Sequence, residues 1–460
     1  MAKTGTHQGF NERRRSGAES ILLISVQYLS NRSNLNGQSP AMNVLLTTVL
    51  LCWSSAAVSE SWPEYRGPTG NGHAAVPTVP LAWSEESNVR WKTKIHDEGW
   101  ATPVILGNQV WLTTALANGK EMYVVCVDRK TGKVLLDRKL FDVASPRPLG
   151  NDLNCYASPS PTIEAGRVYV SFGSYGIACL DTVNFRVIWE RRDLTCNHFR
   201  GPASSLFLSG ELVITHMDGA DYQYIVALRK DSGETVWKTQ RSTDYRDLGE
   251  DGKPIAKGDY RKGFNTPISI EVAGQKLLIS PASKAVYAYR PDTGDEIWQI
   301  PYDGHSTAVR TLFDGRNVFI NSGSGKTELL AVDPLVSTVG DQPRILWRLS
   351  KHIPKRSSPV LVDDLIYSCT DGGVVSCIDK LNGNTVWRQR VGGEFSASLL
   401  YAAGRIYLCN QDGMTLVIEP GNQFKLLAEN HLETGMMASP VALGNALYLR
   451  TKTHLYRIEE

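Results

Sequence analysis

Short runs of apolar residues separated by glycine turns recur along the chain and predict many short β-strands. The recurring unit begins with a small residue and a proline, followed by an apolar strand, a Gly or Asp turn, and a strand holding Val-Tyr or Ile-Tyr. A Gly-rich turn follows, then a third strand ending in small-apolar-Asp, a Thr-Gly or Asn-Gly turn, and a last strand with Trp. Residues 157–189 and 357–387 are two clear copies. Seven units close at Leu136, Trp189, Trp237, Trp298, Trp347, Trp387 and Leu427.

The two ends of the repeat array complement each other. The segment from Met437 onward has the pattern of three strands and then the chain stops, whereas residues 88–95 form a lone strand with Trp91. Pairing the N-terminal strand with the last three strands removes two open sheet edges, which would otherwise invite aggregation. Four-stranded units of about 40–50 residues, repeated radially, form a β-propeller. We therefore predict an all-β fold, an eight-bladed propeller over residues 88–460 that is closed by its N-terminal strand.

The repeat resembles that of a known family. Each unit ends in a fixed order of residues: Ala or Cys, an aliphatic residue, Asp, any two residues, Thr or Asn, Gly, any three residues and Trp. This ending is clearest at residues 125–132 and 377–387. This pattern is similar to the PQQ-like repeat of quinoprotein-type propellers. The stretch WPEYRGPTGNG from Trp62 resembles the start of secreted bacterial PQQ-like propeller proteins, so the resemblance covers about residues 62–460. It is specific for the fold and weak for function.

The N-terminal region has the pattern of a targeting segment. An apolar run follows Met42, and cleavage after Ala57 or Ser59 would satisfy the small-residue rule of signal peptides. We expect residues 1–59 to be leader and signal peptide, with Met42 as the true start or residues 1–41 as a long charged leader. Residues 60–87 are then an N-terminal extension. The predicted location is periplasmic or extracellular, without a transmembrane segment after cleavage. The alternative is a cytosolic protein with a polar N-terminus.

Composition excludes some classes of function. Charged residues make up 21% of the chain and the net charge is +2, without a basic stripe, so we expect no nucleic-acid partner. Residues 322–330, SGSGKTELL, look like a phosphate-binding loop. However, Ile320 stands where the first glycine is needed, and a strand pattern follows in place of a helix. We interpret the glycines as part of a hairpin turn.

The cysteines are interpreted mainly as packing residues. Cys126, Cys179 and Cys377 occupy a repeat position that is Ala in other units, which favours core packing over redox chemistry. Cys155 and Cys196 lie on neighbouring predicted loops, and one hypothesis pairs them in a disulfide, as suits an exported protein.

Propellers bind ligands on the loops that lead into the innermost strands. Nearly every such loop in this sequence carries an aromatic, cationic, His or Met side chain: Trp100, Tyr156, Arg200, Phe264, His305, Arg356, Phe395 and Met437. A ring of flat and cationic groups is suited to a planar anionic ligand or an extended peptide. The alternative interpretation is that these side chains only plug the channel.

The sequence predicts neither a catalytic set nor a metal site. It contains no HExxH, no Gly-x-Ser-x-Gly and no pair of histidines at metal-ligand spacing. In the family that the repeat resembles, quinoprotein dehydrogenases use calcium ligands and a catalytic Asp, and the alcohol dehydrogenases also have an adjacent Cys-Cys pair. This chain has no Cys-Cys pair and no set of Glu, Asn and Asp at matching positions. The insertion at 241–262 is interpreted as a solvated loop that leans over one face.

The predicted function is that of an exported, non-enzymatic binding or scaffold propeller. It resembles the outer-membrane-assembly propeller subunit in architecture. Its partner is expected to be an envelope protein, a peptide or a small planar ligand, and no cofactor is expected. The alternative is a PQQ-dependent dehydrogenase of alcohols or sugars, which would use PQQ with calcium.

Overall fold

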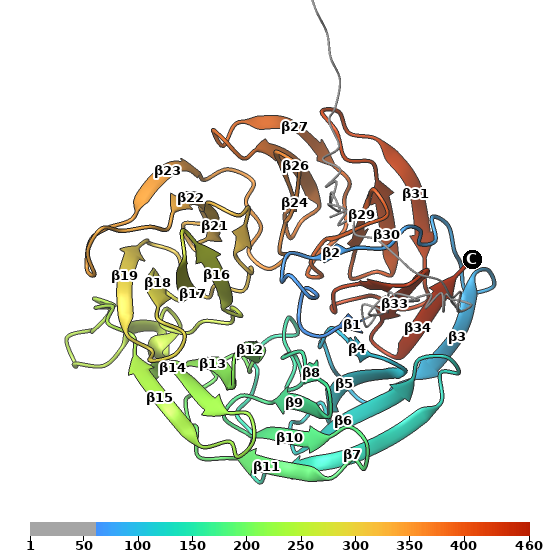
Figure 1. Cartoon of the computed structure of the whole chain (residues 1–460), viewed down its shortest axis with the longest axis horizontal. Helices are drawn as coiled ribbons and strands as arrows, with labels where there is room; N and C mark the ends of the chain where they lie inside the picture. The colour runs from blue at the N-terminus through green and yellow to red at the C-terminus, as the bar shows by residue number, and fades with distance from the viewer. Residues whose placement is uncertain (1–60) are drawn as a thin grey trace, which may run out of the picture. The chain divides into compact units, whose positions relative to one another are not determined.

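The computed structural model describes residues 61–460. These residues form eight sheets arranged in a ring (Figure 1), which confirms the predicted eight-bladed propeller. Within each blade the four strands pair antiparallel, and they are ordered from an innermost strand at the channel to an outermost strand at the rim. The predicted leader, the signal peptide and the candidate start at Met42 lie outside the described residues.

The blades follow one another along the chain. Blade 1 contains β4 (Val104–Leu106), β5 (Gln109–Ala115), β6 (Glu121–Asp128) and β7 (Val134–Asp142). Blade 2 contains β8 (Thr162–Glu164), β9 (Arg167–Ser171), β10 (Ile177–Asp181) and β11 (Val187–Arg191). Blade 3 contains β12 (Phe207–Ser209), β13 (Leu212–Asp218), β14 (Gln223–Arg229) and β15 (Thr235–Gln240). Blade 4 contains β16 (Ile268–Val272), β17 (Gln275–Pro281), β18 (Ala285–Tyr289) and β19 (Glu296–Pro301).

The second half of the ring repeats this plan. Blade 5 contains β20 (Leu312–Phe313), β21 (Val318–Asn321), β22 (Leu329–Asp333) and β23 (Arg344–Leu349). Blade 6 contains β24 (Val360–Val362), β25 (Leu365–Cys369), β26 (Val374–Asp379) and β27 (Thr385–Arg390). Blade 7 contains β28 (Leu400–Ala402), β29 (Arg405–Cys409), β30 (Met414–Ile418) and β31 (Leu426–His431). Blade 8 contains β32 (Val441–Leu443), β33 (Ala446–Arg450), β34 (His454–Glu459) and β3 (Val89–Lys94).

Blade 8 joins the two ends of the described chain. Strand β3 pairs antiparallel with β34, and Thr93 lies opposite Leu455. This pairing confirms that the N-terminal strand completes the last sheet. The connection between blades 3 and 4 contains the predicted insertion 241–262, with a single 3₁₀ turn, η1 (Ile255–Gly258).

One contact repeats between neighbouring blades. The indole Nε1 of the outer-strand tryptophan donates a hydrogen bond to a backbone carbonyl in the turn before the outer strand of the next blade. The pairs are Trp91 with Arg129 at 3.0 Å, Trp189 with Lys230 at 2.9 Å, Trp237 with Pro291 at 3.2 Å, Trp298 with Pro334 at 2.9 Å, Trp347 with Lys380 at 2.9 Å and Trp387 with Gly421 at 2.8 Å. Each of these tryptophans therefore docks on the next blade and bonds to its outer turn.

The turn that accepts the tryptophan hydrogen bond contains a glycine, because the indole ring lies against the backbone there. Gly294 has a φ of +75°, and a Cβ on it would lie 2.4 Å from the ring of Trp237. Both the backbone conformation and the contact exclude a larger side chain, because L-residues rarely adopt positive φ and real carbon atoms do not approach so closely.

Blade 7 departs from the predicted repeat by one residue. Strand pairing places Ala428, and not Leu427, opposite Val417 at the position that Trp occupies elsewhere. The next blade has no turn for a tryptophan to contact, since its outer strand comes from the other end of the chain. Trp83 of the N-terminal segment covers this junction instead, with its backbone N–H bonded to Asn430 Oδ1 at 2.8 Å and its ring stacked on Tyr407.

The phosphate-loop-like stretch is a hairpin turn, as expected. Residues 322–328 connect β21 to β22, and the N–H of Ser322 donates to the carbonyl of Glu328 at 2.9 Å. Gly323 and Gly325 have φ values of +82° and +81°. The chain continues as a strand, so there is no helix N-terminus to bind phosphate here.

Candidate functional site

The N-terminal segment 61–74 crosses one end of the central channel (Figure 1). Its strand β1 (Ser61–Trp62) pairs with β4 of blade 1, and β2 (His73–Ala74) pairs parallel with β28 of blade 7. Between them, the Tyr65 hydroxyl lies 2.8 Å from Ser398 Oγ and 3.3 Å from Ser358 Oγ. The segment therefore spans the ring from blade 1 to blade 7.

A belt of hydroxyl side chains surrounds the channel at this level. In seven places the backbone N–H of a residue just before an innermost strand donates to a hydroxyl of the next blade, at 2.9–3.2 Å. The hydroxyl acceptors are Ser160, Ser205, Thr266, Ser358, Ser398, Ser439 and Thr102. The belt ties the blades together around the axis.

Arg310 stands at the one break in this belt. It occupies the blade 5 position, and its side chain is buried, 1% exposed. The guanidinium donates to Glu64 Oε1 at 2.8 Å, to the Tyr65 carbonyl, and to the Pro267 carbonyl at 3.3 Å. Burial raises the pKa of Glu64, against the opposing effect of Arg310. Arg310 thus anchors the N-terminal segment across the channel.

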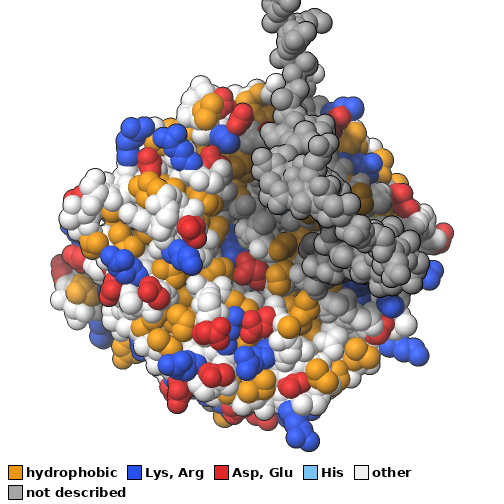
Figure 2. Space-filling model, in the orientation of Figure 1, with side chains coloured by type: hydrophobic (Ala, Val, Ile, Leu, Met, Phe, Trp, Pro, Cys, Tyr) orange, Lys and Arg blue, Asp and Glu red, His pale blue; other side chains and the backbone are white. Residues whose placement is uncertain are grey.

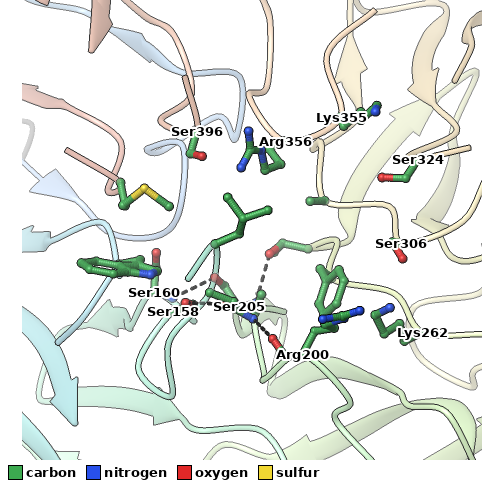
Figure 3. A pocket seen from close by; sticks show the side chains of 18 of the residues that line it. Ser158, Ser160, Arg200, Ser205, Lys262, Ser306, Ser324, Lys355, Arg356 and Ser396 are labelled. Atoms are coloured by element: carbon green, nitrogen blue, oxygen red, sulfur yellow. Dashed lines mark hydrogen bonds between the residues drawn. The ribbon is translucent and has the colours of Figure 1, made fainter. Parts of the chain in front are cut away.

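A pocket of about 360 Å³ lies in the channel mouth with Tyr65 among its lining residues (Figure 3). Six of the eight predicted site residues line it: Trp100, Arg200, Phe264, His305, Arg356 and Met437. They come from loops of different blades, so the structure brings together side chains that are far apart in sequence. Their role in binding stays a prediction.

Tyr156 and Phe395 do not line the pocket. Tyr156 is buried between blades 1 and 2, where its hydroxyl donates to the Arg147 carbonyl at 2.7 Å. Phe395 is 1% exposed and lies in the core between blades 6 and 7. Ser158 and Ser396, from the same two loops, line the pocket instead. The predicted residue and the lining residue are two positions apart in the first loop and one position apart in the second.

Several lining residues were missed by sequence reasoning. Tyr65 comes from the N-terminal segment, and Asp259 and Lys262 come from the insertion. The belt hydroxyls Thr102, Ser160, Ser205, Thr266 and Ser439 line the lower part. A Ser or Thr directly before the innermost strand in most repeats was the available signal.

The charges of the pocket are predominantly positive. Arg200, Lys262, Lys355 and Arg356 line it, and Asp259 is the one carboxylate among the described lining residues. Asp259 contacts the Lys262 ammonium and lies 3.9 Å from Arg200 Nε. Burial and the charge of Arg200 lower the pKa of Lys262 to about 7. Burial and three nearby lysines lower the pKa of His305 to about 4, so this imidazole is neutral at pH 7.

Two hydrogen-bond donors on the pocket wall have no acceptor within the protein. They are Trp100 Nε1 and Arg356 Nη1, both buried. The other side of the Arg356 guanidinium is ion-paired with Asp371 at 3.2 Å and lies 3.8 Å from Glu394. Buried donors are normally satisfied, so these two are exceptions, and both atoms are closed off from the solvent that fills the pocket.

Cys155 and Cys196 do not form the hypothesised disulfide. Both are free and buried. Cys155 Sγ lies 3.4 Å from Ser158 Oγ, and Cys196 Sγ lies 3.4 Å from His198 Nε2. Burial raises the pKa of both thiols, which makes them poor nucleophiles.

The residues of the pocket do not fit PQQ with calcium. No group of three or more His, Cys, Asp or Glu side chains in residues 61–460 could hold a metal ion. The lining carboxylate Asp259 is already engaged by Lys262 and Arg200. Calcium takes six to eight oxygen ligands, several of them carboxylates, and this donor set does not supply them.

Surface charge on the described residues is mixed. On the face shown in Figure 2, Lys and Arg side chains alternate with Asp and Glu side chains, with no continuous basic stripe. The 3₁₀ turn η1 is much too short to cross a bilayer, and no helix of the described part is long and apolar enough to do so.

A family profile described as "Outer membrane protein assembly factor BamB" matches residues 81–246, 223–338 and 333–423. The chain belongs to this family. Three curated proteins with the same description are similar to parts of it. The BamB protein of Yersinia pestis is 20% identical over 276 residues, which are 49% of this chain and 67% of the relative. That of Alkalilimnicola ehrlichii is 23% identical over 192 residues, 41% of this chain and 49% of the relative. That of Shewanella oneidensis is 26% identical over 165 residues, 35% of this chain and 38% of the relative.

Solved structures share the propeller fold at low sequence identity. A europium-containing methanol dehydrogenase has a TM-score of 0.64 and 11% identity, covering 86% of this chain and 90% of the other. BamB from Moraxella catarrhalis has a TM-score of 0.55 and 13% identity, covering 81% and 97%. These likenesses establish the fold alone, because both a dehydrogenase and a BamB protein are among them.

Proposed function

We propose that this BamB-family protein is an exported, non-enzymatic binding propeller that recognises an envelope protein or peptide at its channel mouth. The observation that carries this proposal is the pocket itself. It gathers Trp100, Arg200, Lys262, Arg356 and Met437 from loops of different blades, with no carboxylate pair and no metal-ligand group among its described lining. One hydroxyl–imidazole contact is present, Ser306 Oγ to His305 Nδ1 at 3.0 Å, but the charged neighbours of this imidazole are lysines and not a carboxylate that would orient it as a base. Such a set is suited to binding and orienting a ligand, and it lacks the oriented nucleophile–base arrangement of a hydrolase.

The family relationship also supports a binding role in preference to an enzymatic one. The related proteins are described as outer membrane protein assembly factors, which places them in assembly and not in metabolism. A rigid ring with many loops is also suited to holding a partner in a fixed orientation. We extend this role to the present chain, with the envelope as its location.

An affinity-capture experiment tests the proposal. Full-length protein is compared with Arg200→Glu, which reverses charge at the pocket, and with Arg344→Glu, a matched change on the outer strand β23, where the residue is exposed. The proposal predicts that an envelope protein captured by the wild type and by Arg344→Glu is lost with Arg200→Glu. Equal capture by all three would place binding elsewhere.

The alternative of a PQQ-dependent dehydrogenase is supported by the shared fold alone. Its test is to add PQQ and Ca²⁺ to the purified protein with an alcohol or sugar and a redox dye. We expect no dye reduction and no shift in the quinone absorption. Substrate-dependent dye reduction would overturn the non-enzymatic assignment.

A further inference from the structure

The pocket is closed at its lower end. Tyr65 lines it, and the Tyr65 hydroxyl is held by Ser398 and Ser358 while Arg310 anchors the backbone beside it. A polypeptide therefore cannot pass through the channel at this level. What enters the pocket from the mouth is therefore a chain end, the tip of a loop or a small molecule, and the first and last of these can bring a free carboxylate.

Two unlike walls face this closed space. Met437, Trp100 and Leu153, from the loops leading into blades 8, 1 and 2, provide apolar surface. The loops leading into blades 3, 4 and 6 supply the cations Arg200, Lys262, Lys355 and Arg356. Figure 3 shows Arg200, Lys262, Lys355 and Arg356 spread along one part of the rim. Asp259 contacts Lys262 and lies 3.9 Å from Arg200, and Arg356 is paired with Asp371 and Glu394, so the remaining positive charge of this wall is centred on Arg200 and Lys355.

Backbone strain is found on the cationic wall. Arg200 has a φ of +91°, in the left-handed region that non-glycine residues rarely adopt. The surroundings hold it there, since its carbonyl accepts from Asn154 Nδ2 at 2.7 Å and its Nη1 donates to the Gly150 carbonyl at 2.9 Å. Strain of this kind is typical of ligand-binding positions.

We propose that the pocket captures an apolar group that carries a free carboxylate, and that this is the ligand class behind the proposed binding function. The carboxylate lies against Arg200, where charge-assisted hydrogen bonds are strongest. The apolar group lies against Trp100 and Met437. Two sources have this chemistry: the C-terminus of a polypeptide with an apolar last residue, and a small apolar carboxylic acid. The pocket volume of about 360 Å³ is near the lower limit of ligand sites, roughly 300–1,000 Å³, and suits either.

Fluorescence anisotropy with a defined probe tests this inference. The probe is a labelled Ser-Gly-Ser-Gly-Leu peptide with a free C-terminal carboxylate, added to the full-length protein, and its partner is the same peptide with an amidated C-terminus. We expect the free acid to bind at least tenfold more tightly than the amide. We also expect Arg200→Gln to remove most of this difference and Arg344→Gln to leave it unchanged. Equal binding of acid and amide would overturn the inference.

A competition experiment distinguishes the two sources. Displacement of the peptide by 4-methylpentanoate at a similar concentration would indicate that the small acid is sufficient. Peptide binding at least tenfold tighter than that of the acid would indicate a polypeptide C-terminus. Failure of both probes to bind at about 1 mM, a binding free energy weaker than about 4 kcal/mol, would overturn the inference. The proposed function would still stand in that case if envelope capture depends on Arg200.

Discussion

Trp91 of β3 donates its indole N–H to the carbonyl oxygen of Arg129, 3.0 Å away, and so joins the last blade to the first. The Thr93 hydroxyl, two residues further on, donates to the Gly132 carbonyl of the same turn at 2.6 Å. This is the same contact that joins other neighbouring blades, but here it closes the ring. Its loss would weaken this junction, which is also bridged by the Ser439 N–H to Thr102 Oγ1 at 3.2 Å and by the Arg450 guanidinium to the Thr113 carbonyl at 2.7 Å.

Trp91→Ala is expected to destabilise the protein by about 2 kcal/mol, because it removes the apolar contact of a partly buried indole and its hydrogen bond to the Arg129 carbonyl. Trp91→Phe retains the ring and loses the hydrogen bond, so we expect a loss of about 1 kcal/mol. Urea unfolding measures both. Arg90→Ala, an exposed change on the same strand, serves as the control and should fall within about 0.5 kcal/mol of wild type. Similar stability of Trp91→Ala and Arg90→Ala would show that this contact does not hold the ring.

At the interface between blades 1 and 2, a smaller residue, Leu136, faces a larger one, Phe185, where other blades pair Trp with Gly. Leu136 occupies the Trp position, and Phe185, with a φ of +62°, occupies the position of the turn glycine. The equivalence is supported by Arg138, whose guanidinium donates to the Phe185 carbonyl as Thr93 does to that of Gly132. Phe185 fills the space by packing against the ring of Trp111 at 5.8 Å.

Leu136→Trp alone is expected to cost about 1–3 kcal/mol through overpacking against Phe185. Phe185→Gly alone is also expected to destabilise, because it leaves a cavity beside Trp111. The double variant restores the Trp–Gly pairing found in other blades. Its loss of unfolding free energy should therefore be smaller, by at least about 1 kcal/mol, than the sum of the losses of the two single variants. A double-mutant cycle by urea unfolding measures this coupling, and strict additivity would contradict it.

Asp218 forms a buried ion cluster between blades 3 and 4. Its carboxylate accepts from Arg241 at 3.0 and 2.9 Å and lies 2.6 Å from His216 Nδ1, and all three side chains are inaccessible. Asp218→Asn leaves the guanidinium buried without its counter-charge, and we expect a loss of about 3–5 kcal/mol at pH 7. Asp244→Asn, on the exposed insertion, is the control and should have little effect.

The same cluster predicts a pH dependence. Burial acts to raise the pKa of Asp218, but Arg241 and His216 together lower it to about 2, below the ordinary value of 3.8. A lowered folded-state pKa contributes stability above the unfolded value and loses it as pH falls toward the folded one. The difference in unfolding free energy between wild type and Asp218→Asn should therefore be constant from pH 7 to about 5 and shrink from about pH 4 toward 2. A difference that grows on acidification would contradict this assignment.

Arg310 is expected to control whether the N-terminal segment stays in the channel. Arg310→Met removes the contacts to Glu64 and Tyr65 and leaves a buried carboxyl without its partner. We expect amide exchange of residues 61–72 to accelerate at least tenfold in hydrogen–deuterium exchange, while the outer strands stay protected. Arg316→Met, on the exposed turn between β20 and β21, should leave exchange unchanged. Unaltered protection of residues 61–72 in Arg310→Met would show that the segment is held by other contacts.

The ring could be predicted from the sequence because every blade repeats the same requirements. A tryptophan, a turn glycine and a small residue in the third strand recur at fixed spacing, and Cys126 pairs with Leu136 as Ala227 pairs with Trp237. The exceptions were harder to predict, since they depend on partners far away in sequence. Ala428 occupies the Trp position in blade 7, and Trp83, from the stretch before β3, packs at that junction.

The candidate site was predictable at the level of loops and less so at the level of side chains. Each mouth loop could be located, but whether Tyr156 or Ser158 faces the channel depends on how the loop packs on its neighbour. The part played by Tyr65 and Arg310 could not be predicted, because no local pattern indicates that the segment around Trp62 returns to cross the channel. The belt of hydroxyls was visible only as single Ser and Thr residues before innermost strands.

The most direct test of the central claim, that this propeller binds its partner at the channel mouth, is site-specific photo-crosslinking in cells. A photoreactive amino acid is placed at Met437, which lines the pocket, and in a second strain at Arg388, which is exposed on the outer strand β27. We predict a discrete crosslinked envelope partner from position 437 that is absent from position 388 and lost when Arg200→Glu is added. Crosslinks at 388 alone, or a product at 437 that persists with Arg200→Glu, would contradict the account.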